Sequence, residues 1–306
     1  MENNVLGIVP AGPVVSPDFV ASSCSTTSCP ALHNLPSPVI GIMPTRIPKE
    51  EDFTQLSPSL HVALVYPEVP ETTTAILVLF HGLGDSEESF AALAKNLNLS
   101  GVLAIAVRGV SPLPPALLGL PDSEASSPTK HFHWGDGLTL SSSTGDLDPD
   151  PGFSKAERLV LGKLIRETLI ERCGWETNDI LLFGFGQGGS LALGLSSRIR
   201  NNERVVDITE GDKAAGATFK GVVSIGGPLP MSMVPTLTSR DKARTPSLIC
   251  HGRSSELLDE EAMDVLKQEF IDVREVKWKK ADDSMPKNRD EMLPIMQFFA
   301  ERLRGW

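Results

Sequence analysis

The sequence has no apolar run that approaches the about 20 residues needed for a membrane-spanning helix. It also lacks any basic residue before Arg46, although residues 5–15 are largely apolar. A secretory signal begins with basic residues and a mitochondrial presequence carries arginines, so neither kind of leader is indicated. We therefore expect a cytoplasmic protein without a membrane span.

Cysteine is scarce, with four residues in a chain of 306. Cys24 and Cys29 have a C-x4-C spacing, but no second pair follows that could complete a zinc site. Cys173 and Cys250 lie far apart in the sequence. We therefore predict no metal site and no disulfide framework.

Basic residues are fewer than acidic ones, with 28 lysines and arginines against 39 aspartates and glutamates. The resulting net charge of −11 repels DNA, RNA and anionic lipid surfaces. We expect no nucleic-acid partner.

The sequence divides at about residue 56. Residues 1–56 are rich in proline, serine and threonine and show no helical or strand period, which is typical of a flexible N-terminal arm. Residues 57–306 have the patterning of one folded domain. Within this domain, residues 110–152 and 201–218 predict long loops, which are functional or irregular in most proteins.

Short apolar runs alternate with segments of helical spacing through the predicted domain. Strands that alternate with helices predict a mostly parallel sheet with helices on both faces. A capping box beginning at Ser154 indicates one helix start, and Pro294 is expected near the first turn of the last helix. The predicted strands are 60–66, 75–80, 102–107, 179–185, 221–225, 247–251 and 273–278, and the predicted helices are 86–97, 154–174, a helix from 188 and a closing helix that includes 292–303.

Six short motifs follow one another in the predicted domain. They resemble, in the same order, motifs of the acyl-protein thioesterase and carboxylesterase family of the α/β-hydrolase superfamily. One such motif is weak evidence, but the ordered set indicates the α/β-hydrolase fold. The motifs are HGLGD at 81–85, FHWGD at 132–136, GFGQGG at 184–189, SIGGPLP at 224–230, CHG at 250–252, and EM at 291–292 with QF at 297–298.

The resemblance implies three catalytic positions, and all three have changed. The nucleophilic serine is expected at the turn from strand to helix, where this chain has Gly186. The acid is expected in the pattern HG-x-x-D, where this chain has Ser255, with Glu256 one place out of register. The histidine is expected six residues before Glu291, where this chain has Met285.

Triad hydrolysis requires an activated nucleophile, a base and a group that orients the base. Gly186 has no side chain, so it forms no acyl intermediate. Ser190 is one helical turn further on, and we interpret it as a packed helical residue. His251 is the last histidine of the chain and is expected to be structural, while His131 and His133 are expected to face solvent from the long loop. The alternative is an active ester or thioester hydrolase whose catalytic residues have moved to other positions.

Backbone groups of an oxyanion hole survive side-chain replacement. By resemblance, the donors would be the amides of Leu83 and Gln187, where the positive end of a helix also points. His81, His133 and Trp134 are candidate pocket residues. We predict a catalytically impaired pseudoenzyme that binds a small acyl, ester or anionic ligand, or an acylated protein, and that needs no cofactor. Self-association is implied by the resemblance alone.

Two further classes of function remain open. Gly184, Gly186 and Gly189 match the dinucleotide-binding pattern GxGxxG, but at least two strands precede it, and the candidate ribose-binding residues Glu203 and Asp207 lie in a charged loop. A pure interaction protein is the other class, with the arm and the long loops as its surface.

Overall fold

The computed structural model describes residues 45–114, 130–138, 147–199, 218–236 and 241–304. Contacts divide the chain into two units, Met1–Gly41 and Ile42–Trp306. The first unit, which makes up most of the predicted arm, lies outside the described residues. The fold described below is therefore that of the second unit. No helix among the residues described is long and apolar enough to span a membrane.

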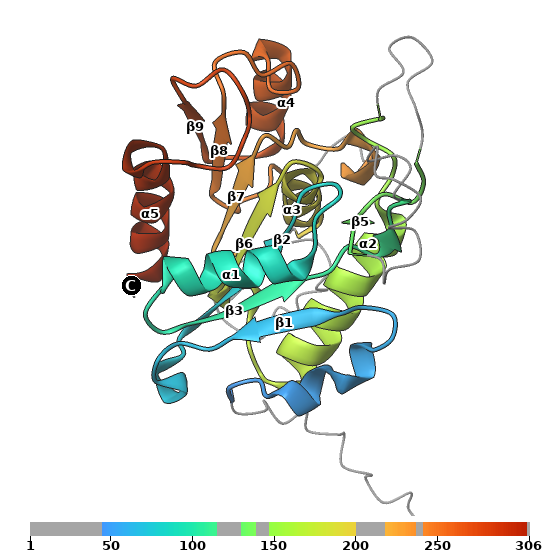
Figure 1. Cartoon of the computed structure of the whole chain (residues 1–306), viewed down its shortest axis with the longest axis vertical. Helices are drawn as coiled ribbons and strands as arrows, with labels where there is room; N and C mark the ends of the chain where they lie inside the picture. Colours follow the sequence, from blue (N-terminus) through green and yellow to red (C-terminus); the bar gives the residue numbers. More distant parts are fainter. Residues whose placement is uncertain (1–44, 115–129, 139–146, 200–217, 237–240, 305–306) are drawn as a thin grey trace, which may run out of the picture. The chain divides into compact units, whose positions relative to one another are not determined.

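A seven-stranded sheet forms the centre of this unit and confirms the predicted α/β architecture (Figure 1). All neighbouring strands are parallel except the edge strand β1, which pairs with β3 in the antiparallel sense. The central strands consist of continuous apolar runs because both of their faces are covered. In spatial order the strands are β1 (Val62–Val65), β3 (Val102–Val107), β2 (Ala75–Phe80), β6 (Ile180–Phe185), β7 (Gly221–Ile225), β8 (Ser247–His251) and β9 (Val273–Lys277).

Helices cover both faces of the sheet (Figure 1). On one face, α1 (Glu87–Leu97) and α5 (Arg289–Leu303) bury side chains such as Phe90 and Phe299. The other face carries α3 (Gln187–Arg198), α4 (Glu260–Glu269) and α2 (Ser154–Glu157), which continues as the π-helical η5 (Arg158–Arg172). Smaller elements are η1 (Glu50–Leu56), η2 (Pro70–Thr72), η6 (Thr177–Asp179), η8 (Met231–Met233), and the short hairpin of β4 (Ser111–Pro112) and β5 (Phe132–His133).

The folded unit begins earlier than the predicted boundary at residue 57. Phe53 and Leu56 are buried in the core under the α3 face of the sheet. The indole of Trp175 donates a hydrogen bond to the carbonyl oxygen of Arg46 at 2.9 Å, and the Arg46 guanidinium pairs with Asp52 at 2.6 Å. Residues 45–56 are therefore part of the domain and not of the arm.

The start of α2 was predicted correctly, but its cap was not. Ser154 is the first helical residue and does not act as the cap. The carboxylate of Asp136, from the FHWGD motif, accepts hydrogen bonds from the amides of Ser154 and Lys155, both at 2.8 Å. Burial opposes ionisation of this carboxylate, but those two amides hold the pKa of Asp136 below its ordinary value. Asp136 therefore caps the start of α2, the role that the capping box predicted for the Ser154 side chain.

Two other helices differ from the sequence-based prediction. No helix was predicted between the strands 247–251 and 273–278, where the structure has α4, whose cap is the Asp259 side chain accepting from Ala262 N at 2.8 Å. The last helix begins at Arg289 after the cap Asn288, so Pro294 lies beyond the first turn and not within it. The missing N–H of Pro294 leaves one carbonyl of that helix without its usual partner.

The strand order reverses between β2 and β6. From β2 the chain passes to β3 on one side, and it later returns to place β6 on the other side of β2. In open sheets of this kind, ligands bind outside the carboxyl ends of the strands at such a reversal. A ligand site is therefore expected at the loops that follow β2 and β6.

Candidate functional site

Gly186 forms the sharp turn between β6 and α3. Its backbone angles, φ 52° and ψ −122°, are rarely adopted by residues with a side chain. The turn is fixed because the Gly186 amide donates to Ile225 O at 2.8 Å and the Gly186 carbonyl accepts from Ser190 N at 3.0 Å. A Cβ built on Gly186 would meet no heavy atom of the described structure within 4 Å. The turn has the form expected of a nucleophile elbow, with open space where the nucleophile would stand.

The other glycines of the GFGQGG motif are explained by close packing. A Cβ on Gly188 would lie 2.4 Å from the carbonyl oxygens of Phe80 and His81, and one on Gly184 would lie 2.2 Å from Gly188 O. One on Gly189 would lie 2.5 Å from the Ser224 hydroxyl oxygen. The start of α3 therefore packs directly on the end of β2, and the glycines need no bound dinucleotide to account for them. Glu203 and Asp207 lie outside the described residues.

The two predicted oxyanion donors lie at this junction. Gln187 is the first residue of α3, so its amide has no acceptor within the helix. Within the described residues, neither the Leu83 amide nor the Gln187 amide donates to a backbone carbonyl. The Gln187 side chain is held in place because its Oε1 accepts from Trp134 N at 2.7 Å. The oxyanion role of the two amides stays a prediction.

His81 and Trp134 support the scaffold and do not line an open pocket, which corrects the prediction. His81 is fully buried, its Nδ1 donates to Gly82 O at 2.7 Å, and its Nε2 accepts from Gly109 N at 2.8 Å. This pattern fixes a neutral imidazole, and burial lowers the pKa of His81. The Trp134 indole is also buried and donates to His81 O at 2.8 Å. Both rings fix the loop that carries Leu83.

His133 is buried as well, against the expectation of a solvent-facing histidine. Its Nδ1 has no hydrogen-bond partner in the described structure. Burial, and then the nearby Lys155 ammonium, lower the pKa of His133. The neighbouring His131 donates from Nδ1 to Gly84 O at 2.7 Å. No group of three metal-binding side chains occurs among the described residues, so the two histidines find no third ligand there.

The acid position holds a hydroxyl that faces a carboxylate from another loop. Ser255 Oγ donates to Asp283 Oδ2 at 2.7 Å, and Asp283 Oδ1 accepts from Gly252 N at 2.8 Å. Glu256 is exposed, and no hydrogen bond or ion pair of its side chain is seen in the part of the chain that the structure describes. Asp283 was not predicted as a site residue, because it belongs to the loop after β9 and reaches the end of β8 only in the folded chain.

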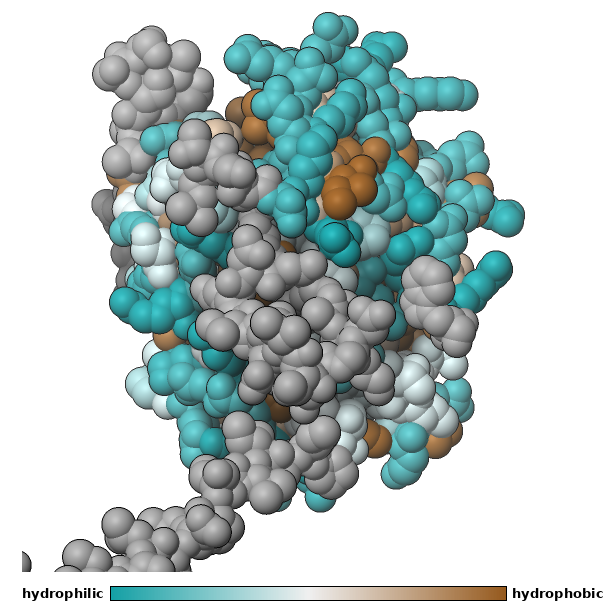
Figure 2. Space-filling view, turned by 180° about the vertical axis from the view of Figure 1, so that it is seen from behind, coloured by the Kyte–Doolittle hydropathy of each residue, from teal (hydrophilic) through white to brown (hydrophobic). Residues whose placement is uncertain are grey.

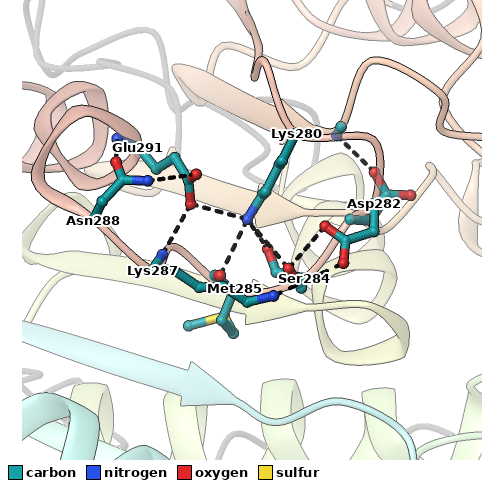
Figure 3. A network of polar contacts seen from close by, with 9 residues as sticks. Lys280, Asp282, Ser284, Met285, Lys287, Asn288 and Glu291 are labelled. Carbon is teal, nitrogen blue, oxygen red and sulfur yellow. Dashed lines mark hydrogen bonds and ion pairs between the residues drawn. The ribbon is translucent and has the colours of Figure 1, made fainter.

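Met285, which the motifs predict at the base position, lies on a loop held by several polar contacts (Figure 3). Its side chain is half-buried against the core under α1 and α5. Its carbonyl accepts from Lys280 Nζ at 3.1 Å, and the same ammonium pairs with Glu291 at 3.2 Å. The amide of Lys287, together with Lys280 and Asn288, holds the pKa of Glu291 below its ordinary value. The loop is therefore well anchored but presents a thioether where the family places an imidazole.

Ser190 and His251, the candidates for relocated catalytic groups, are both buried. Ser190 is buried inside α3. The ring of His251 is buried, with Nδ1 2.8 Å from Gly252 O and Nε2 3.1 Å from Glu275 Oε1 on the edge strand β9. Both ring nitrogens are thus engaged away from Gly186. Two cavities of about 330 and 290 Å³ lie beside Tyr66, and no residue of the elbow lines either of them.

Comparison with known proteins places this geometry in a family. The model of the phospholipase/carboxylesterase family matches residues 61–303, which is most of the chain. The chain belongs to the phospholipase/carboxylesterase family. That Gly186, Ser255 and Met285 stand at the family's nucleophile, acid and base positions is a prediction from the motifs.

Individual relatives agree with the family. An uncharacterized hydrolase of Schizosaccharomyces pombe is 28% identical over 161 residues, which cover 52% of this chain and 55% of that protein. One of Mycosarcoma maydis is 31% identical over 121 residues, covering 39% of this chain and 40% of that protein. The chain thus matches about half the length of these curated relatives.

Solved structures show the same fold at low identity. Zea mays acyl-protein thioesterase 2 superimposes with a TM-score of 0.54 and 19% identity, covering 79% of this chain and 99% of that chain. The esterase PE8 superimposes with a TM-score of 0.55 and 15% identity, covering 80% of this chain and 100% of that chain. These likenesses support the α/β-hydrolase fold.

Proposed function

We propose that this chain is a non-hydrolysing member of its family that binds an acyl or carboxylate-bearing ligand at the β6–α3 elbow. The observation that carries the proposal is Gly186, which keeps the elbow conformation but has no nucleophile. The ligand would be a free acyl compound, an ester or the acyl group of a modified protein, and no cofactor is required.

The loss of hydrolysis follows from the missing groups. Removal of the serine or the histidine of a triad lowers turnover by roughly a millionfold, and further losses add little. Here the serine position is glycine and the base position is methionine. Ser190 and His251 are both buried and do not replace them.

Binding is supported by what remains around Gly186. No heavy atom of the described residues occupies the space in front of the glycine, and α3 begins there with its N-terminal amides and the positive end of its dipole. Exposed apolar side chains follow β2, β7 and β8 at the same edge of the sheet, with 39% of Leu83, 60% of Met231 and 45% of Leu257 accessible. On the face in Figure 2, hydrophobic residues form small patches among hydrophilic ones, and Val69, Ile271 and Leu293 are also exposed. An amphipathic acyl carboxylate matches this combination of amides and apolar groups.

Octanoate binding, measured by isothermal titration calorimetry, tests this proposal. We expect wild type to bind octanoate and Leu83→Asp to bind it on the order of tenfold more weakly, because an apolar contact is lost and a like charge is added. Val69→Asp is the matched control, since Val69 is exposed to 51% but follows β1 and not an elbow strand. Absence of binding to wild type, or equal weakening by both substitutions, would contradict the proposal.

A further inference from the structure

The carboxylate of Asp283 lies at the carboxyl ends of β7 and β8. Its Oδ1 accepts from the Gly252 amide at 2.8 Å, directly after the last residue of β8. Its Cβ packs over the end of β7, because a Cβ on Gly226 would lie only 2.8 Å from it. The next residue, Gly227, packs against the elbow, where its own Cβ would lie 2.3 Å from Gly186 O. Asp283 therefore contacts the residues that directly follow β7 and β8, and the neighbouring Gly227 packs against the elbow.

Ser255 accommodates this carboxylate. Its hydroxyl donates to Asp283 Oδ2 at 2.7 Å and accepts from Leu258 N at 3.2 Å. A serine at position 255 can donate a hydrogen bond to the Asp283 carboxylate. An aspartate at the same position would place a second carboxylate at hydrogen-bond distance from Asp283 and repel it. The serine at position 255 and the carboxylate of Asp283 are therefore complementary.

Met285 follows Asp283 by two residues on the same loop. The loop is fixed because Lys280 Nζ bonds to the carbonyl of Met285 and pairs with Glu291 (Figure 3). In Figure 3 the side chain of Met285 turns away from Lys280, and it packs on the core under α1 and α5. Position 285 therefore lies two residues from Asp283 on a loop that these contacts hold in place.

We infer that Asp283 has taken the place of the family's acid, so that this chain lacks two catalytic side chains and not three. The inference rests on the proposed loss of hydrolysis and makes it more specific. In a chain with Gly186→Ser and Met285→His, Asp283 would act as the positioning residue that orients the new imidazole. The spacing HG-x-x-D that the resemblance implies is then not needed for the acid function.

Reaction with a phosphonofluoridate tests this inference in the full-length chain. The oxygen of the introduced serine attacks phosphorus, the P–F bond breaks, fluoride leaves, and the serine proton passes to the introduced imidazole. We expect the double variant Gly186→Ser, Met285→His to be labelled, and the addition of Asp283→Asn to slow labelling on the order of a hundredfold or more. Adding Ser255→Ala instead keeps the carboxylate while it removes one of its hydrogen bonds, so labelling should slow far less.

The pKa of the introduced imidazole, followed by NMR titration, gives a readout that needs no reactivity. A carboxylate within contact distance raises an imidazole pKa, so Asp283→Asn should lower it by roughly one unit while Ser255→Ala should not. If Asp283→Asn changes neither the labelling rate nor the imidazole pKa of the double variant, the inference is overturned. Labelling or ester turnover by the unmodified chain would instead overturn the proposed function, so the two failures are distinguishable.

Discussion

Gly186 has a backbone conformation that costs a side chain free energy, and no heavy atom of the described residues lies within 4 Å of where its Cβ would stand. The motif placed this glycine at the nucleophile position from the sequence alone, because the elbow is a local strand-turn-helix feature. Asp283 was not predictable in this way, since its contacts with Gly252 and Ser255 join residues about 30 positions apart. The burial of His81 also depends on a distant partner, the Gly109 amide.

Substitutions at two glycines of the motif separate backbone strain from steric overlap. We expect Gly186→Ala to lower the free energy of unfolding by about 1–3 kcal/mol, because only the backbone angles oppose it. Gly188→Ala should cost more, about 3 kcal/mol or above, since its Cβ would overlap two carbonyl oxygens at 2.4 Å. Urea unfolding of the two variants checks the order, and a larger loss for Gly186→Ala would show that the elbow is more crowded than described.

At the scale of elements, the alternation of apolar runs and helical segments correctly predicted all seven strands of the sheet and most of the helices. The helix α4 was not predicted because its first turn is charged at Glu260 and Glu261, although Asp259 followed by Met263 and Leu266 has helical spacing. Residues 45–56 were missed because a 3-10 turn has no strong period, and only tertiary contacts fix it.

The ion pair that holds this segment predicts a pH dependence. The Arg46 guanidinium lowers the pKa of Asp52 to about 2, so the stabilisation is complete above the unfolded value near 4 and is lost as the pH falls toward 2. Because 41% of the Arg46 side chain is exposed, we expect only about 1 kcal/mol. Urea unfolding should show Asp52→Asn less stable than wild type at pH 6, with a smaller difference at pH 2.5.

The exposed pair of Lys163 and Glu167 supplies the control for this measurement. Glu167→Gln should change the free energy of unfolding by less than about 0.5 kcal/mol at either pH. An Asp52→Asn difference that is the same at pH 6 and pH 2.5 would show that the carboxylate does not carry the stabilisation.

At the scale of the whole molecule, the sheet and its strand reversal accompany membership of a hydrolase family, while we propose that the nucleophile and the base needed for hydrolysis are replaced by Gly186 and Met285. The fold depends on packing spread over many residues, and the chemistry depends on three. A chain can therefore lose its catalytic groups and keep its architecture, the close approach of α3 to β2 and the amides at the elbow.

Hydrolysis of p-nitrophenyl esters by the purified wild-type chain tests the central claim most directly. The account predicts that p-nitrophenyl acetate and octanoate are hydrolysed no faster than by an equal concentration of Gly186→Ala, and no faster than the background reaction with protein surface groups. Turnover that rises in proportion to the wild-type concentration, exceeds that background and persists in Gly186→Ala would contradict it, because catalysis would then come from residues other than the elbow.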